Sequence, residues 1–509
     1  MGSDRTRFFL VIFSAAFFAT TAVAAPEKHV VVVVWDGMRP DFVTEQNTPT
    51  LWKLAQSGVF FRNNHSVYPS ATIVNGTAIV TGNYPNDDGI LANHLYRADL
   101  DSRKSIDTEN VQVVRKGDDV SAGKYVSVPT IAELLHARGD QTAIATAKTV
   151  GFLFDRNENL RHGQDIFAGQ SVPPDGIKTL ITSLGAFPPA TKPAERDEWT
   201  TKALIDSLWK DGVPTFSLLW LSEPDDTEHK TAPGAPAALA AIKSSDENLA
   251  RVLSALEKHN ARSTTDVFVV SDHGFSTIAR EIELPKILRA AGFDAVTEFN
   301  GEPKPGQIML AGNGGTVLFY VIDHDAAITR RLVEFLQQTD FAGVIFTRQQ
   351  MEGTFALDKA KIDNLHAPDV EMAFRWTEDK NPFGAPGMID ADWQRSAGKG
   401  THATLSRFDM HNTLIAAGPD FANGLTSKLP SGNVDVTPTI LSILGMKPPA
   451  EMDGRVLMEA LKNGQNPKSE THTIEATKKF SGGIWRQRLT SSRVGTTVYL
   501  DEGNGEFGP

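Results

Sequence analysis

The stretch Val30-Val31-Val32-Val33-Val34-Trp35 decides the fold class of this 509-residue chain. A run of β-branched residues without a polar interruption is typical of a strand buried on both faces of a parallel sheet. Asp36 follows the run directly, at the point where the strand is expected to end. Ligands of open α/β sheets bind beyond the carboxyl ends of the strands. Asp36 is therefore a candidate functional residue.

Helix and strand patterns alternate along most of the remaining chain. Thr48-Pro49-Thr50 begins a helical pattern that Gly58 closes. This alternation predicts an α/β fold, a three-layer sandwich around a mostly parallel central sheet. Further helices are expected at residues 130–137, 202–209, 237–256 and 434–444, and further strands at 141–146, 215–221, 266–271 and 413–417.

The alternation is interrupted once, which indicates how the chain is organised. Residues 276–399 contain paired glycines and Pro/Gly-rich loops such as 381–387, and we interpret them as an inserted cap or lid region. The core is then expected to comprise residues 25–275 and 400–463. Residues 464–509 are expected to form a C-terminal tail, polar at first and β-like at 493–500.

The N-terminus has the pattern of a cleavable signal peptide, at about residues 1–24. Arg5 and Arg7 precede an apolar run that begins at Phe8, and Ala22-Val23-Ala24 offers a small-residue cleavage site. The alternative is a retained membrane anchor, but the apolar run is short for a membrane span. We therefore expect export to a periplasm or secretion, without a stable membrane anchor.

Composition excludes several classes of function. A formal net charge of −12 and the lack of a basic run argue against binding of nucleic-acid duplexes. The chain contains no cysteine, which excludes disulfides, thiolate metal ligands and a cysteine nucleophile. An acidic protein can still act on anionic substrates if bound metal ions invert the local field. The oligomeric state does not follow from the sequence.

Potential metal ligands recur in three short motifs. Asp and His are ligands that zinc accepts, and paired metals are typical of phosphoryl-transfer sites. Each ligand also has a structural interpretation, as a helix cap, a loop histidine or a surface residue. Their shared position beside strand-like or Gly-marked segments predicts a two-metal hydrolase site. The motifs are Ser271-Asp272-His273-Gly274, the segment 223–229 with Asp225 and His229, and Gly400-Thr401-His402; together with Asp36 they supply six ligands.

Thr72 is the candidate nucleophile. It lies in Tyr68-Pro69-Ser70-Ala71-Thr72, ahead of an apolar helical pattern that ends at Gly82. A threonine at a helix N-terminus faces free N–H groups that favour an alkoxide and a phosphoryl oxygen. The alternative is that Thr72 or Ser70 only caps the helix.

These motifs, in this order, resemble the alkaline phosphatase superfamily, and within it the nucleotide pyrophosphatase/phosphodiesterase branch. The resemblance covers about residues 29–275 and 400–450. A match of several blocks in the right order is specific, whereas any one block is weak. The blocks that carry it are Asp36-Gly37-Met38-Arg39, Thr48-Pro49-Thr50-Leu51, Tyr68-Pro69-x-x-Thr72-x-x-Asn75, Thr81-Gly82-x-Tyr84-Pro85 and Gly89-Ile90.

The resemblance implies roles for the site residues. Thr72 would be a metal-activated nucleophile that forms a covalent phospho-threonine, and the Asn93 side chain would steady a phosphoryl oxygen. The cofactors implied are two Zn²⁺, although Mn²⁺ or Fe could bind similar ligands. One zinc would be held by Asp36, Thr72, Asp272 and His273, and the other by Asp225, His229 and His402.

The chain departs from the family pattern where a nucleobase would bind. Relatives carry an aromatic residue directly after the nucleophile, and this chain has Ile73. They also carry His before the Gly-Ile pair, where this chain has Asp88. Trp220 matches the other position that stacks on a base, and its alternative is a buried core tryptophan. Base stacking is therefore an open question.

Lys148 introduces a second open question about the substrate. It follows the 141–146 strand, as in the phosphomonoesterase and phosphonate-hydrolysing branches, where a lysine contacts the extra charge of the substrate. Those branches have another basic residue two positions later, and this chain has Val150. The alternative for Lys148 is a solvated charge at a strand end. The remaining histidines of interest, His65, His94, His162 and His411, match no ligand position and are interpreted as structural or surface residues.

The leading hypothesis is an exported two-zinc phosphohydrolase that cleaves phosphodiester or pyrophosphate bonds of a small phosphate-ester substrate. The second is a phosphomonoesterase or phosphonate hydrolase of the same superfamily. A non-catalytic binding protein is the remote alternative, because the expected ligands and the nucleophile are all present.

Overall fold

The computed structural model describes residues 2, 27–156 and 163–509. The expected signal peptide therefore lies outside the described residues, except for residue 2, and so does His162.

The centre of the fold is a nine-stranded sheet in the order β22-β2-β21-β10-β1-β9-β6-β7-β8. The five strands from β10 to β7 run parallel, while β21 and β8 are antiparallel to their neighbours. The mostly parallel sheet predicted from the sequence is thus confirmed. The strands are β1 (His29–Trp35), β2 (Val59–Phe61), β6 (Thr142–Thr146), β7 (Gly163–Phe167), β8 (Gln170–Val172), β9 (Phe216–Leu221), β10 (Thr265–Val270), β21 (Leu414–Ala417) and β22 (Leu425–Ser427).

The valine run forms the middle strand, β1, and every residue of the strand is buried. Its side chains alternate between the two faces of the sheet, as the pleat requires. Val30, Val32 and Val34 belong to the hydrophobic cluster on one face. Val31 and Val33 belong to the cluster on the other face. A continuous apolar run is therefore needed here because both faces are covered.

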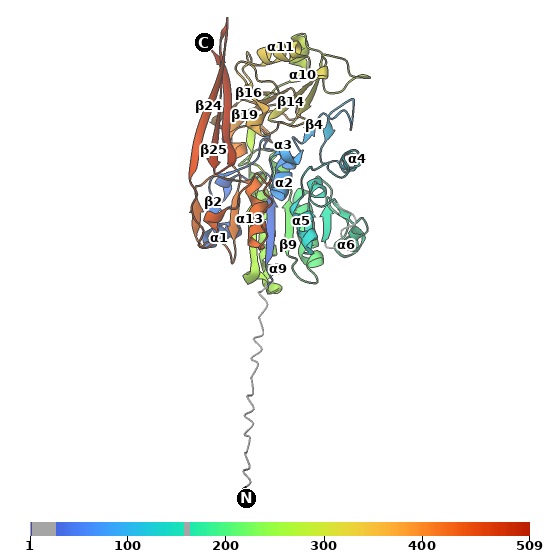
Figure 1. The fold of residues 1–509 in the computed structure, drawn as a ribbon, viewed down its shortest axis with the longest axis vertical. Helices are drawn as coiled ribbons and strands as arrows, with labels where there is room; N and C mark the ends of the chain where they lie inside the picture. The colour runs from blue at the N-terminus through green and yellow to red at the C-terminus, as the bar shows by residue number, and fades with distance from the viewer. Residues whose placement is uncertain (1, 3–26, 157–162) are drawn as a thin grey trace.

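Helices cover both faces of the central sheet, which gives the expected three layers (Figure 1). One face carries α1 (Pro49–Ser57), α7 (Pro193–Lys202) and α9 (Pro236–Lys258), which pack against one another. The other face carries α2 (Thr72–Thr81), α5 (Ile131–Arg138) and α13 (Val436–Ile443). The helix expected at 202–209 begins earlier than predicted, because α7 passes directly into a π-helical segment, Ala203–Leu208.

Residues 276–401 form two smaller sheets above the central one (Figure 1). Helices α10 (Leu284–Ala290) and α11 (Ala326–Leu336) lie at this end of the molecule. Strand β20 pairs with β11 and ends one residue before His402, so this region delivers a site residue. The six-stranded sheet contains β12 (Ala295–Val296), β13 (Ile308–Gly312), β14 (Thr316–Val321), β17 (Val370–Phe374), β15 (Ala342–Thr347) and β16 (Phe355–Ala356); the four-stranded sheet contains β18 (Trp376–Lys380), β19 (Pro386–Ala391), β11 (Ser276–Glu281) and β20 (Gly400–Thr401).

The C-terminal tail is a three-stranded antiparallel sheet of β24 (Ser469–Phe480), β25 (Gly483–Val494) and β26 (Thr497–Gly508). The β-like stretch expected at 493–500 was wrong as a single element, because the chain reverses at Gly495 with a φ of 60°. The sheet runs along one side of the molecule (Figure 1). It reaches the core through Tyr499, whose hydroxyl lies 2.7 Å from Asp435 Oδ2.

Candidate active site

Three carboxylates meet at the carboxyl edge of the central sheet. Val34 of β1 is in register with Val270 of β10, so Asp36 and Asp272, each two residues further on, lie side by side. Asp225 begins the short helix α8 (Asp225–Glu228) after β9, and its backbone N–H donates to the carbonyl of Asp36 at 3.1 Å. All three side chains are buried. The sheet topology therefore gathers acids that are far apart in the sequence.

Asp36, Asp272, His273 and Thr72 form the first ligand group. His273 Nε2 lies 3.6 Å from Asp36 Oδ1 and 3.2 Å from Asp272 Oδ2. Thr72 Oγ1 lies 3.2 Å from the same nitrogen. Thr72 is the first residue of α2, so its hydroxyl is presented at a helix N-terminus. These four side chains were grouped from the family resemblance, and the structure brings them together.

Asp225, His229 and His402 form the second ligand group. His229 lies one helical turn after Asp225, and its Nε2 is 3.2 Å from Asp225 Oδ1. His402 Nε2 is 3.6 Å from the same oxygen. The His273 and His402 rings stack with a centroid distance of 3.7 Å, so the two groups are adjacent.

The three imidazoles use Nδ1 for their hydrogen bonds to backbone carbonyls, so each Nε2 faces the carboxylates. His229 Nδ1 lies 3.0 Å from the carbonyl of Gly400, His273 Nδ1 lies 2.9 Å from that of Gly274, and His402 Nδ1 lies 2.8 Å from that of Ser70. A carbonyl only accepts, so each Nδ1 carries the hydrogen. Each Nε2 then points into the site, and an Nδ1–H bonded to a backbone carbonyl is the usual outer support of metal-bound histidines.

One oxygen of each carboxylate lacks a hydrogen-bond partner: Asp36 Oδ1, Asp225 Oδ1 and Asp272 Oδ2. These are the atoms that face the Nε2 nitrogens. Buried polar atoms are normally paired, and lone pairs that face one another across 3.2–3.6 Å repel unless a cation lies between them. Zinc bonds of about 2.0–2.2 Å place tetrahedral ligands about 3.3–3.5 Å apart. The side chains present therefore fit two metal ions.

The charges of the site agree with this fit. Burial, with Asp225 and other neighbours, raises the pKa of Asp272 to about 6. Burial and the nearby Asp272 also raise the pKa of Asp36. For Asp225, burial is outweighed by His229 and Lys148, which hold its pKa well below the usual value. Burial and His273 lower the pKa of His402, which keeps that ring neutral. Neutral imidazoles and buried carboxylates are the forms that bind a divalent cation.

Asn93 lies beside the candidate nucleophile. Its Oδ1 accepts a hydrogen bond from the backbone N–H of Ile73 at 3.0 Å. That bond fixes the amide plane, and the Nδ2 group is the remaining donor of the side chain. Asn93 also lines the cavity in front of Thr72.

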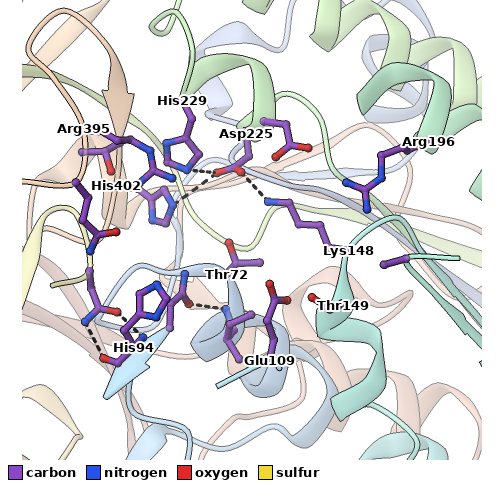
Figure 2. A pocket seen from close by; sticks show the side chains of 17 residues that line it. Thr72, His94, Glu109, Lys148, Thr149, Arg196, Asp225, His229, Arg395 and His402 are labelled. Atoms are coloured by element: carbon purple, nitrogen blue, oxygen red, sulfur yellow. Dashed lines mark hydrogen bonds and ion pairs between the residues drawn. The ribbon is translucent and has the colours of Figure 1, made fainter. Parts of the chain in front are cut away.

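Lys148 lies between the two ligand groups. Its Nζ lies 2.8 Å from Asp36 Oδ2 and 2.6 Å from Asp225 Oδ2, so it joins one carboxylate of each ligand group. Figure 2 shows the contact with Asp225. Burial would lower the pKa of Lys148, but Asp225 and Asp36 outweigh it and raise the pKa above the usual value. The lysine is therefore not a solvated charge at a strand end, and its contact with the substrate stays a prediction.

The position of Trp220 contradicts the stacking role considered for it. Its side chain is fully buried, and its Nε1 donates to Asp36 Oδ2 at 2.9 Å. β9 is a central strand with both faces covered, which leaves no ring surface for a base. Ile73 is also buried, with an exposed fraction of 2%. Trp220 instead orients the Asp36 carboxylate, a candidate metal ligand.

A cavity of about 310 Å³ opens in front of Thr72 and contains residues that the sequence motifs did not reveal. Arg196 on α7 and Arg395 after β19 lie on opposite sides of Thr72 in Figure 2. They sit outside every motif, and no signal in the sequence singled them out. His94, interpreted as structural or surface, also lines this cavity. The remaining residues missed at this site are Glu109, Thr149, Ala168, Asn313 and Gln394.

The other described histidines set aside in the sequence analysis join the tail to the core. His65 Nε2 lies 2.8 Å from Asp501 Oδ1 on β26, and His65 Nδ1 lies 2.8 Å from the Ser431 carbonyl. The His411 ring packs against His65 at a centroid distance of 4.5 Å. With both nitrogens beside oxygens, His65 links the core to β26.

The fold and the two ligand groups define an alkaline phosphatase-like protein. The chain belongs to the type I phosphodiesterase/nucleotide pyrophosphatase family, whose sequence model matches residues 30–384.

The chain is similar to venom phosphodiesterase of Macrovipera lebetinus, with 24% identity over 83% of this chain and 44% of the relative. It is 23% identical to ectonucleotide pyrophosphatase/phosphodiesterase family member 3 of Mus musculus, over 82% of this chain and 42% of that protein. The chain therefore spans less than half of these two relatives. It is 22% identical to bis(5'-adenosyl)-triphosphatase enpp4 of Xenopus laevis, over 82% of this chain and 77% of that protein.

Solved structures confirm the fold. Human ectonucleotide pyrophosphatase/phosphodiesterase 5 superimposes with a TM-score of 0.60 and 16% identity, over 85% of this chain and all of that one. The murine protein gives a TM-score of 0.61 with the same identity and coverage.

None of the helices in residues 27–156 and 163–509 is long and apolar enough to span a membrane.

Proposed function

We propose that the protein is an exported, metal-dependent phosphohydrolase that cleaves phosphodiester or pyrophosphate bonds through Thr72. The observation that carries this proposal is the set of unpaired oxygens on Asp36, Asp225 and Asp272, each facing an imidazole Nε2. Relatives named as a phosphodiesterase, a nucleotide pyrophosphatase and a bis(5'-adenosyl)-triphosphatase point to the same bond types.

Asp36, Asp272, His273 and Thr72 would hold one divalent metal, and Asp225, His229 and His402 the other. Mixed nitrogen and oxygen ligands suit zinc, and Mn²⁺ or Fe are the alternatives. When bound, such a pair lowers the pKa of a hydroxyl and neutralises charge on the attacking and leaving oxygens.

Thr72 then acts as the nucleophile. Its Oγ1 forms a bond to phosphorus while the bond from phosphorus to the leaving oxygen breaks, and the product is a phospho-threonine. Water breaks the new bond in a second step and restores the Thr72 hydroxyl. The Asn93 amide, anchored by the Ile73 N–H, is the donor for a non-bridging phosphoryl oxygen.

Metal content and the activity of Thr72 variants test this proposal. Purified mature protein should contain two divalent metal ions per chain and release p-nitrophenol from bis(p-nitrophenyl) phosphate. Thr72→Ala should abolish the release, while the matched Thr72→Ser, which keeps a hydroxyl, should retain part of it. A metal-free protein, or a Thr72→Ala variant as active as the parent, contradicts the proposal.

A second candidate is a phosphomonoesterase or phosphonate hydrolase, and Lys148 is the observation in its favour. Lys148 lines the cavity, and a dianionic phosphoryl group carries an extra charge that a lysine can offset. Two carboxylates already engage its Nζ, which favours the diester assignment. Comparison of p-nitrophenyl phosphate with bis(p-nitrophenyl) phosphate decides between them, since a monoester preference of orders of magnitude supports the second candidate.

Export is proposed on two grounds. The signal-peptide pattern at residues 1–24 is the first, and relatives whose names describe venom enzymes and an ectonucleotide enzyme are the second. Fractionation of cells that express the full chain tests it. Processed protein in the periplasm or medium supports export, and full-length protein in the cytosol contradicts it.

A further inference from the structure

The residues that line the cavity in front of Thr72 form two walls. His94, Asn313, Gln394 and Arg395 form one, the cap wall. Glu109, Thr149, Ala168 and Arg196 form the other, the core wall, which continues from the buried Ile73. The two walls contact different parts of a substrate whose phosphorus lies at Thr72.

The cap wall lies beside the second ligand group. Arg395 lies beside His229 and His402 in Figure 2. His229 belongs to the group opposite the nucleophile, where the leaving oxygen departs in an in-line displacement. The core wall is then left for the ester group that stays on phosphorus.

The core wall carries unpaired polar atoms that are buried. Glu109 Oε2 and Arg196 Nε each lack a hydrogen-bond partner in the described residues. Buried polar atoms of this kind require an explanation, and a bound ligand is one. The Arg196 guanidinium stacks on the ring of Phe187, with its Cζ 4.8 Å from the ring centroid. The stack fixes the plane of its N–H donors.

Glu109 is held in place on its other side. Its carboxyl group lies beside Thr149 and the backbone of Val150, and burial raises its pKa to about 7. Near neutral pH, the unpaired oxygen of this group can accept a hydrogen bond as a carboxylate or donate one as an acid. Hydroxyl groups match both states, because they donate and accept.

The core wall is unsuited to a nucleobase. Among the described residues, no Phe, Tyr or Trp lines the cavity. Ile73 and Trp220 are buried, and Ala168 offers only a methyl group. Base–aromatic stacking contributes about 1–3 kcal/mol per base where it occurs, so its absence removes a main source of base affinity.

We propose that the core wall binds the retained ester group and takes a hydroxylated, non-aromatic alcohol, such as a glyceryl or sugar group, through Glu109 and Arg196. This inference rests on the proposed function, since it assigns one side of the substrate of that reaction. The retained ester group that we infer is not a nucleoside, because the core wall supplies hydrogen bonds in place of an aromatic surface.

The test uses three diesters with the same p-nitrophenolate leaving group: methyl, glyceryl and thymidine-5' p-nitrophenyl phosphate. The glyceryl ester should exceed the methyl ester in kcat/KM by about tenfold, the size of one good hydrogen bond to a charged group. The thymidine ester should not exceed the glyceryl ester. A thymidine ester that is preferred over the glyceryl ester overturns the proposal.

Substitutions on each wall distinguish the contributions of the two walls to substrate preference. Glu109→Gln and Arg196→Gln should each lower the ratio of glyceryl to methyl kcat/KM by about threefold, because the two contacts share a preference of about tenfold. Arg395→Gln is the matched control, because it removes the same charge from the cap wall and should leave that ratio unchanged. Two core-wall variants are used so that a failure of one to fold does not end the test.

The outcomes distinguish a failure of the proposed function from a failure of the core-wall assignment. If the parent protein hydrolyses none of the three diesters, the proposed function fails and this inference fails with it. If the parent hydrolyses them but both core-wall variants keep the parent ratio, only the assignment of the core wall is overturned.

Discussion

Trp220 Nε1 donates a hydrogen bond to Asp36 Oδ2 at 2.9 Å, from a fully buried strand position to a fully buried carboxylate that is a candidate metal ligand. Lys148 Nζ contacts the same oxygen at 2.8 Å. Asp36 Oδ1, in contrast, has no hydrogen-bond partner among the described residues and faces His273. We infer that the two oxygens of Asp36 have separate tasks: the protein fixes one, and the other would bind a metal ion.

Trp220→Phe tests this division. The substitution keeps an aromatic ring in the core but removes the donor to Asp36, so the carboxylate loses part of its fixed orientation. Loss of an outer partner typically costs about 10–100-fold in metal affinity, and we expect a decrease of that size. Competition with a chelator measures it, with bound metal determined at equilibrium.

Trp209→Phe is the matched control for that measurement. Trp209 is also fully buried, and its Nε1 donates to Ser217 Oγ at 2.9 Å, a contact that involves none of the ligands. It should lose stability without losing metal. Equal metal affinity in both variants contradicts the role given to Trp220.

Lys148→Met removes the cation shared by Asp36 and Asp225. Breaking a buried charge cluster by removal of one partner costs about 3–5 kcal/mol, because the remaining charges are left uncompensated. We expect a decrease of about 3 kcal/mol in the free energy of unfolding of the chelated protein at pH 8, measured by urea titration.

The metal-loaded protein should lose less stability on the same substitution, because bound cations then balance both carboxylates. Lys178→Met is the control, since Lys178 pairs with Asp175 on the exposed surface, and its removal should have no measurable effect. A loss of the same size with and without metal argues that Lys148 acts through packing and not through the carboxylates.

Glu371 on β17 should make the stability of the protein depend on pH. Burial raises its pKa to about 8 from the ordinary 4.5. A carboxyl whose pKa is raised by folding contributes its stability below the unfolded pKa and loses it as the pH rises through the folded pKa. The window is therefore pH 4.5 to 8.

Glu371→Gln isolates this contribution, because the amide is neutral at every pH and similar in size. The difference in unfolding free energy between parent and variant should change by up to about 1.4 kcal/mol per pH unit inside the window, with the parent losing stability as the pH rises. Urea titrations at pH 5, 6.5 and 8 measure it. A difference that stays constant over these values rules out titration of Glu371.

Much of the candidate metal site could be predicted from the sequence, because its candidate ligands lie in short motifs at strand ends. Asp36 and Asp272 follow continuous apolar strands, and a parallel register brings such positions together without further information. His229 lies one helical turn from Asp225, so local geometry joins them. His402 could be assigned only from the family resemblance, because it follows β20, after the chain has passed through the two smaller sheets.

The substrate side of the site could not be predicted in the same way. Arg196 and Glu109 lie on a helix and in a loop without any motif, and only the packing of distant segments brings them to one cavity. Trp220 was compatible with stacking or burial, and the position of β9 between β1 and β6 decided for burial. The turn at Gly495 interrupts the β-like stretch 493–500, which belongs to β25 before the turn and to β26 after it.

Asn93→Asp provides the most direct test of how the oxygens of the phosphoryl group are held. The aspartate keeps an acceptor for the Ile73 N–H, so the loop and helix α2 should stay in place. It replaces the Nδ2 donor by a negatively charged oxygen that faces the phosphoryl group. Loss of one such donor costs about 10²–10³ in kcat in other enzymes, and the added repulsion should bring the decrease at least to that range.

The measurement is kcat and KM for bis(p-nitrophenyl) phosphate, with thermal unfolding as the check on folding. Asn93→Ala is the companion variant: it loses both the acceptor and the donor, and it should unfold at a lower temperature than Asn93→Asp. If the donor matters most, both variants lose kcat, although only the alanine variant loses stability. An aspartate variant with parental kcat would show that the Asn93 amide orients the backbone of Ile73 and does not contact the substrate.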